Sequence, residues 1–135
     1  MDPVLIRRAH RRPHDVTWKH AAGLAVQIHR TAAGESAARA GLSTPLQKAA
    51  LQIPARVALA RLEPGPLGGR RHLLAALRIL TELESHLRIA IDLLPDERNA
   101  LKHHLRAGQI LYRLILTLAL RPEPGRVTDS RVFSP

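Results

Sequence analysis

Cysteine is absent from the 135-residue chain, which excludes a disulfide framework, a thiolate metal site and a cysteine nucleophile. No apolar run approaches the roughly 18 residues that read as a membrane span. The first residues carry arginines but no apolar h-region, so we expect no signal peptide. Length and composition together predict a cytoplasmic, single-domain protein that does not interact with a membrane.

Aromatic residues are equally scarce: only Trp18, Tyr112 and Phe133 are present. Alanine, leucine and arginine dominate, and strand-forming residues never alternate over a useful length. This pattern favours an all-α chain. With so few rings, base stacking would add little to any nucleic-acid binding.

Acidic residues number 11 against 21 basic residues, which gives a formal net charge of +10. Only three of the basic residues are lysines. A GC-rich coding bias explains arginine in place of lysine, but it does not explain the surplus of base over acid. The surplus favours a phosphate-bearing partner, for which the guanidinium fork has a geometric advantage.

Proline and glycine divide the chain into four expected helices, an N-terminal arm and a tail. In the second helix, Thr44 is expected as the cap, with Pro45 at the first helical position and Gln47 completing a capping box. In the third, Leu73, Leu80, Leu87 and Leu94 form a heptad row. The expected segments are a basic arm over residues 1–12, a four-helix bundle over 13–120 and a flexible tail over 121–135. The four helices are expected from after Pro13 to Gly34, from the 43–47 stretch to about Leu62, from about Arg70 to Leu94, and from after Pro95 to Leu120.

Short connections between four helices predict an up-down bundle. One proline tests this prediction, because Pro54 lies in the middle of "ALQIPARVALA". A proline inside a helix removes a hydrogen bond and clashes with the preceding turn. Val57 and Ala58 nevertheless keep the apolar spacing of Ala50 and Ile53, so we expect a continuous helix that is kinked at Pro54.

The stretch "GLSTPLQKAALQIPARVALA" resembles the signature of small four-helix-bundle proteins from ribosomal-RNA intervening sequences. A second block, "ELESHLRIA" over residues 82–90, resembles the third-helix block of that family. Three positions depart from the family pattern: Arg56 replaces its Asn, Leu59 its Glu and Ala60 its Gly. The positions that match the signature are Gly41, Leu42, Lys48, Ala49, Ala50, Ile53, Pro54 and Ala58.

The same superfamily contains the accessory variability determinant (Avd) proteins of diversity-generating retroelements. The resemblance, over roughly residues 16–120, implies a ring-like, probably pentameric assembly that binds a reverse transcriptase and its RNA. A stand-alone intervening-sequence-type bundle is the alternative within the family. No cofactor or metal is implied.

The last expected helix ends in "ILYRLILTLAL", which is apolar on most of its circumference. A helix of that kind usually buries a second surface. We therefore predict a homo-oligomer interface, in which Leu116 and Leu120 are the positions least needed by a single bundle. The residues expected at the interface are Ile110, Tyr112, Leu116 and Leu120.

Basic residues recur at helical spacing and predict contacts to RNA or DNA phosphates, largely without sequence preference. The alternative, a merely solvated charged face, fits poorly because the second helix has no acid before Glu63. The residues expected to bind nucleic acid are Arg7, Arg8, Arg11, Arg12, Lys48, Arg56, Arg71, Arg78, Arg98, Lys102 and Arg106.

An enzyme of another class remains as an alternative. "RNALKH" fits the Arg-Asn-x-x-x-His pattern of HEPN-type ribonucleases, in which Arg98 and His103 would act on the ribose hydroxyl and phosphate. The tyrosine often found two residues beyond that histidine is Leu105 here. His10 and His14 could grip a metal from one helix face, but their arginine-rich surroundings repel cations. We therefore predict a non-enzymatic protein with no catalytic and no metal-binding residues.

Overall fold

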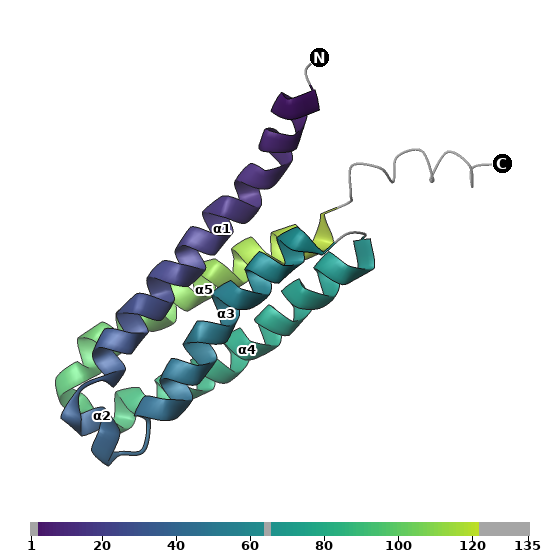
Figure 1. The fold of residues 1–135 in the computed structure, drawn as a ribbon. Coiled ribbons are helices and arrows are strands. Elements are labelled where there is room, and N and C mark those ends of the chain that lie inside the picture. Colours follow the sequence, from purple (N-terminus) through teal and green to yellow (C-terminus); the bar gives the residue numbers. More distant parts are fainter. Residues whose placement is uncertain (1–2, 64–65, 122–135) are drawn as a thin grey trace.

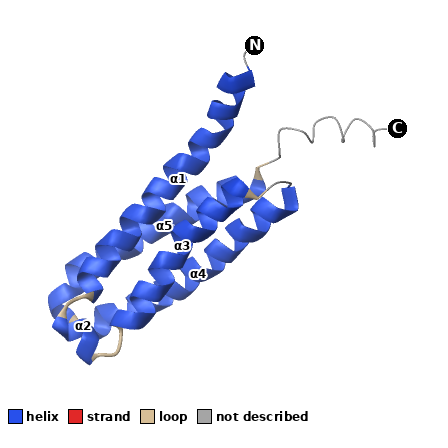
Figure 2. Cartoon of the chain, viewed as in Figure 1, coloured by secondary structure: helices blue, strands red, loops and turns tan. Residues whose placement is uncertain are grey.

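The computed structural model describes the backbone of residues 3–63 and 66–121, and the side chains of residues 12–63 and 67–121. Every regular element in these ranges is helical (Figures 1 and 2), so the all-α prediction is confirmed. Four long helices are joined by short pieces. The elements are α1 (Pro3–Ala32), α2 (Glu35–Arg39), α3 (Ser43–Leu62), α4 (Pro66–Leu93), the 3-10 turn η1 (Pro95–Glu97) and α5 (Arg98–Leu120).

The long helices form a bundle in which α1 and α4 each pack against both α3 and α5. Helices α3 and α5 therefore occupy diagonal positions (Figure 1). Their apolar sides meet in one core that all four long helices share. The heptad row is confirmed, because its four leucines are all buried: Leu73, Leu80, Leu87 and Leu94.

Two expected helix boundaries are wrong, and both errors come from proline and glycine. Helix α1 begins at Pro3 and continues through Pro13, so residues 3–12 belong to the first helix and not to a separate arm. Helix α4 begins at Pro66 and includes Gly68 and Gly69, where we expected a break. A Cβ on Gly69 would lie 3.1 Å from the carbonyl oxygen of Ala60. The glycine there allows α3 and α4 to approach closely rather than ending a helix.

Helix α3 is continuous through Pro54, as its apolar spacing predicted, while the kink stays a prediction. The expected capping box is wrong: Leu42 occupies the cap position and forms no side-chain cap hydrogen bond. Ser43 instead donates from Oγ to the carbonyl of Ala32 at 2.6 Å, which ties the start of α3 to the end of α1. The short helix α2, which the sequence did not predict, fills the connection between them.

Candidate nucleic-acid interface

Helix α5 carries four exposed basic side chains, from Arg98, Lys102, Arg106 and Arg113, and no acidic residue. None of the four forms an ion pair within the described part of the chain. Three of them stand on the outer side of the helix, because each lies nine residues, or about two and a half turns, from a buried position. These pairs are Lys102 with Leu111, Arg106 with Ile115, and Arg113 with His104.

We call Lys102, Arg106 and Arg113 the α5 ridge. Their spacing of four and then seven residues spreads them over about 16 Å of helix, at a rise of about 1.5 Å per residue. Double-stranded nucleic acid carries one negative charge per roughly 1.7 Å of its axis. A ridge of this length can therefore lie along several phosphates at once.

Beside the ridge, a groove of about 480 Å³ runs between α1 and α5. Lys19, His20 and Gln27 line it from α1, and His103 and Ile110 from α5. No carboxylate lines this α1–α5 groove. Lys19, Gln27 and the imidazole rings of His20 and His103 can each donate a hydrogen bond to an anion.

His104, at the floor of this groove, is buried and links α5 to α1. Its Nε2 lies 2.7 Å from Thr31 Oγ1, whose hydroxyl donates to the carbonyl of Gln27. Nε2 therefore carries the proton and donates to Thr31. Burial, and next to it the positive charge of His103, lower the pKa of His104. The His104 ring is thus a neutral connector between α5 and α1 at neutral pH.

The structure separates the other predicted phosphate contacts from the ridge. Arg56 is half-buried, with Nη1 3.2 Å from Nδ1 of His72 on α4. Arg71 lies 3.1 Å from Glu63, which also contacts His72. Both arginines are therefore engaged between α3 and α4. Lys48 and Arg78 are exposed, on α3 and α4 respectively.

The N-terminal arginines are only partly described. The side chains of Arg7, Arg8 and Arg11 lie outside the described residues. Arg12 is exposed and lines a second hollow between α1 and α5, together with Arg121. Sequence reasoning missed Lys19 and Arg30, which follow Arg12 by 7 and 18 residues on the outer side of α1. That spacing was readable, but only for a helix that continues through Pro13.

The four residues predicted for an oligomer interface do not form one surface. Ile110 is exposed in the α1–α5 groove, whereas Tyr112 lines the opposite side of α5 next to α4. Leu120 is 70% exposed. Leu116 is partly buried and packs on the core, so the expectation that a single bundle does not need it is wrong.

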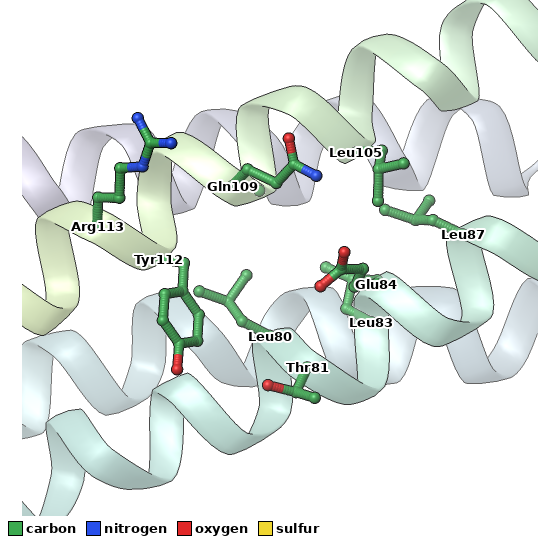
Figure 3. A pocket seen from close by; sticks show the side chains of 10 residues that line it. Leu80, Thr81, Leu83, Glu84, Leu87, Leu105, Gln109, Tyr112 and Arg113 are labelled. Atoms are coloured by element: carbon green, nitrogen blue, oxygen red, sulfur yellow. The ribbon is translucent and has the colours of Figure 1, made fainter.

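A third hollow, of about 500 Å³, lies between α4 and α5 (Figure 3). Glu84 from α4 and Gln109 from α5 extend into the gap, with Tyr112 beside them. Glu84 also accepts from Arg88 at 2.8 Å. Because a carboxylate is present, this side of α5 suits an anion less well than the α1–α5 groove does.

Arg98 and His103, the pair expected in the ribonuclease alternative, lie on different sides of α5 within one chain. Arg98 begins α5, and His103 lies five residues later, about 140° around the helix, in the α1–α5 groove. Arg98 does not line that groove. In the described ranges no three histidine or carboxylate side chains gather closely enough to hold a metal ion.

None of the described helices has the combination of length and apolar character needed to cross a bilayer. Comparison of the chain with models of known protein families, with curated proteins and with solved structures found no match.

Proposed function

We propose that this protein is a non-enzymatic, self-associating bundle that binds the phosphate backbone of nucleic acid along α5. One observation carries the proposal: α5 contains no acid and presents four exposed basic side chains that form no ion pair with any residue that the structure describes. Binding of this kind depends on counterion release and has little sequence preference. The α1–α5 groove extends the same positive surface through Lys19.

The most specific form of the proposal is an Avd-like accessory subunit that brings RNA to a reverse transcriptase. Its support is the resemblance of residues 41–60, with Ile53-Pro54 inside a helix that the structure keeps continuous. The basic ridge is compatible with such a role because it offers charge without base readout. The partner protein would bind elsewhere on the bundle.

The test is a titration of fluorescently labelled RNA and DNA of unrelated sequences, followed by anisotropy over a series of salt concentrations. We expect the logarithm of the association constant to fall linearly with the logarithm of the salt concentration. The slope should be about −0.7 to −0.9 for each phosphate contact. Lys102→Glu with Arg106→Glu should reduce the affinity for every probe by roughly 10- to 100-fold and flatten the slope by about two.

A matched control changes the net charge equally but away from the ridge. Arg39→Glu with Arg88→Glu removes two basic residues that are already held in ion pairs with Glu35 and Glu84. This variant should lose much less affinity. Equal losses in the two double variants would mean that only the net charge matters, and absence of binding at low salt would refute the proposal. RNA cleavage that His103→Ala abolishes would replace it with the nuclease.

A further inference from the structure

The hollow between α4 and α5, which we call the α4–α5 hollow, has an apolar floor and a polar rim (Figure 3). Half-buried Glu84 comes to the rim from α4, and exposed Gln109 and Tyr112 come from α5. At about 500 Å³ the hollow has the size of a small-ligand site, which is typically apolar with a few polar groups. The floor consists of Leu80, Leu83, Leu87 and Leu105.

A glycine in α5 leaves room at this floor. Gly108 lies four residues after His104 and three before Leu111, both of which are buried, so it occupies an inward position of the helix. A Cβ there would lie 3.9 Å from Leu24 and 4.0 Å from Leu80, which are ordinary contact distances. Packing therefore does not require a glycine, and glycine is less favourable than alanine inside a helix. Its missing side chain instead provides space in the α4–α5 hollow, which Gly108 lines.

The polar groups at the rim have hydrogen-bonding capacity that the described part of the chain does not use. Glu84 accepts from Arg88 through Oε1 at 2.8 Å, and its Oε2 has no hydrogen-bond partner among the described residues. The side chains of Gln109 and Tyr112 form no hydrogen bond to those residues either. A ligand in the hollow would meet an acceptor from α4 and, from α5, an amide that both donates and accepts.

The α4–α5 hollow adjoins the α5 ridge. Arg113 belongs to the ridge and also lines the hollow. Gln109 lies three residues after Arg106 and four before Arg113, and residues at this spacing are neighbours on the surface of a helix. A strand whose phosphates lie along the ridge therefore passes beside the hollow.

We infer that the α4–α5 hollow takes one unpaired guanine base from a nucleic-acid strand whose phosphates lie on the α5 ridge. The inference rests on the proposed function and adds to it a base preference that the ridge does not supply. A neutral base suits the hollow better than a phosphate does, because the Glu84 carboxylate repels an anion. Proteins recognise unpaired bases by stacking on an aromatic ring and by hydrogen bonds to the Watson–Crick edge. Tyr112 supplies a ring at one end of the hollow (Figure 3).

The rim matches guanine better than the other bases. Along its Watson–Crick edge guanine presents the O6 acceptor, followed by the N1–H and N2–H donors. The Glu84 carboxylate can accept from both N–H groups, and the Gln109 amide can donate to O6 from the other helix. Adenine and cytosine offer only an amino group on this edge, and uracil offers one N–H between two carbonyl oxygens. Each of these bases would therefore turn a lone pair toward the carboxylate.

The test measures the binding of short single-stranded RNA probes that differ only in one central base, with uracil at every other position. Fluorescence anisotropy at low salt gives the affinity of each probe. The guanine probe should bind roughly tenfold more tightly than the adenine, cytosine or uracil probe, because a bidentate base contact discriminates by about this factor. A probe with hypoxanthine at the central position lacks the N2 amino group, and its affinity should be intermediate.

Two variants locate the base in the hollow. Glu84→Gln keeps the side chain's size but replaces an acceptor oxygen by a donor, so it should reduce the guanine preference to about twofold or less. It should not weaken binding of the all-uracil probe. Glu35→Gln is the matched control, because it also removes a carboxylate paired with an arginine four residues later, and it should keep the preference. Gly108→Met fills the floor and should abolish the preference, with circular dichroism as the check of its fold.

Equal affinities for the four bases would overturn the inference and leave the proposed function standing, because contacts to phosphates do not depend on the base. A preference for a base other than guanine would overturn it too. So would a guanine preference that persists in Glu84→Gln or in folded Gly108→Met, because the base would then lie elsewhere; should Gly108→Met not fold, Glu84→Gln decides alone. Absence of binding to every probe at low salt would refute the inference together with the proposed function.

Discussion

Helices α3 and α5 occupy diagonal corners of the bundle and bury one side each in the same core, yet their outer sides differ. Neither helix contains an acidic residue. On its outer side α3 presents exposed leucines at 51, 59 and 62, whereas α5 presents the basic ridge. The inward spacing places both helices in the shared core, and the outward spacing is not constrained by that core.

If the inward sides of α3 and α5 are equivalent, a cavity made in the core from either helix should lower the free energy of unfolding by the same amount. Ile53 of α3 and Ile115 of α5 are both buried. We expect Ile53→Ala and Ile115→Ala each to lower the free energy of unfolding by about 2 to 5 kcal/mol, because each removes buried methyl groups and leaves a cavity. Urea denaturation of both variants measures this. A loss near zero for one of them would show that its helix is not held by the common core.

Two leucines at the end of α5 locate the border between inward and outward sides. Leu116 packs on the core and Leu120 is 70% exposed. Leu116→Glu should lower stability by roughly 1 to 3 kcal/mol because it partly buries a charge, and Leu120→Glu should stay within about 0.5 kcal/mol. Thermal melts of the two variants side by side provide the measurement. Equal effects would contradict this border.

The inward sides were largely predictable from the sequence, and the outward sides were not. Helix formers and the leucines at heptad spacing in α4 predict an all-α bundle because burial follows helical periodicity. The helix boundaries expected at Pro13 and Gly69 were wrong, because whether a proline or glycine ends a helix depends on its neighbours in space, such as the Ala60 carbonyl beside Gly69. The ridge was partly predicted from the spacing of Lys102 and Arg106.

Other parts of the surface needed the packing itself. The α1–α5 groove depends on which residues of α1 face α5, and the sequence does not contain that pairing. In α3, two apolar spacings run along one helix, through Ile53 and through Leu62. Only the positions of α1 and α4 decide which of the two faces the core.

The two helices also differ in the partners of the buried histidine that each of them contains or contacts. His104 of α5 meets a neutral hydroxyl, while His72 beside α3 meets Glu63 and Arg56. Burial lowers the pKa of His104 in the folded protein below the ordinary 6.5, so the unfolded chain binds more protons as pH falls. The stabilisation is therefore complete above about pH 6.5 and lost below it, at up to about 1.4 kcal/mol per pH unit.

Urea denaturation at pH 7.5, 6.5 and 5.5 should show this loss. His104→Gln keeps a donor for Thr31 without titrating, so it should flatten the pH dependence over this interval. His103→Gln, at the exposed neighbouring ring, should leave most of it in place. A slope that His104→Gln does not change would assign the pH dependence to other groups.

The smallest expected effect concerns Pro54, which distinguishes α3 from the proline-free α5. Pro54→Ala restores an N–H that can donate to the carbonyl of Ala50, a gain of about 1 kcal/mol. The substitution also increases the conformational entropy of the unfolded chain, which lowers the stability by about 0.4 to 1 kcal/mol. The two terms nearly cancel, so we expect stability to change by less than about 1 kcal/mol, with helical content unchanged. Hydrogen exchange should then detect a protected amide at position 54. A protected amide with a large gain in stability would mean that the proline strains α3, and an unprotected amide would mean that the backbone there stays bent without it.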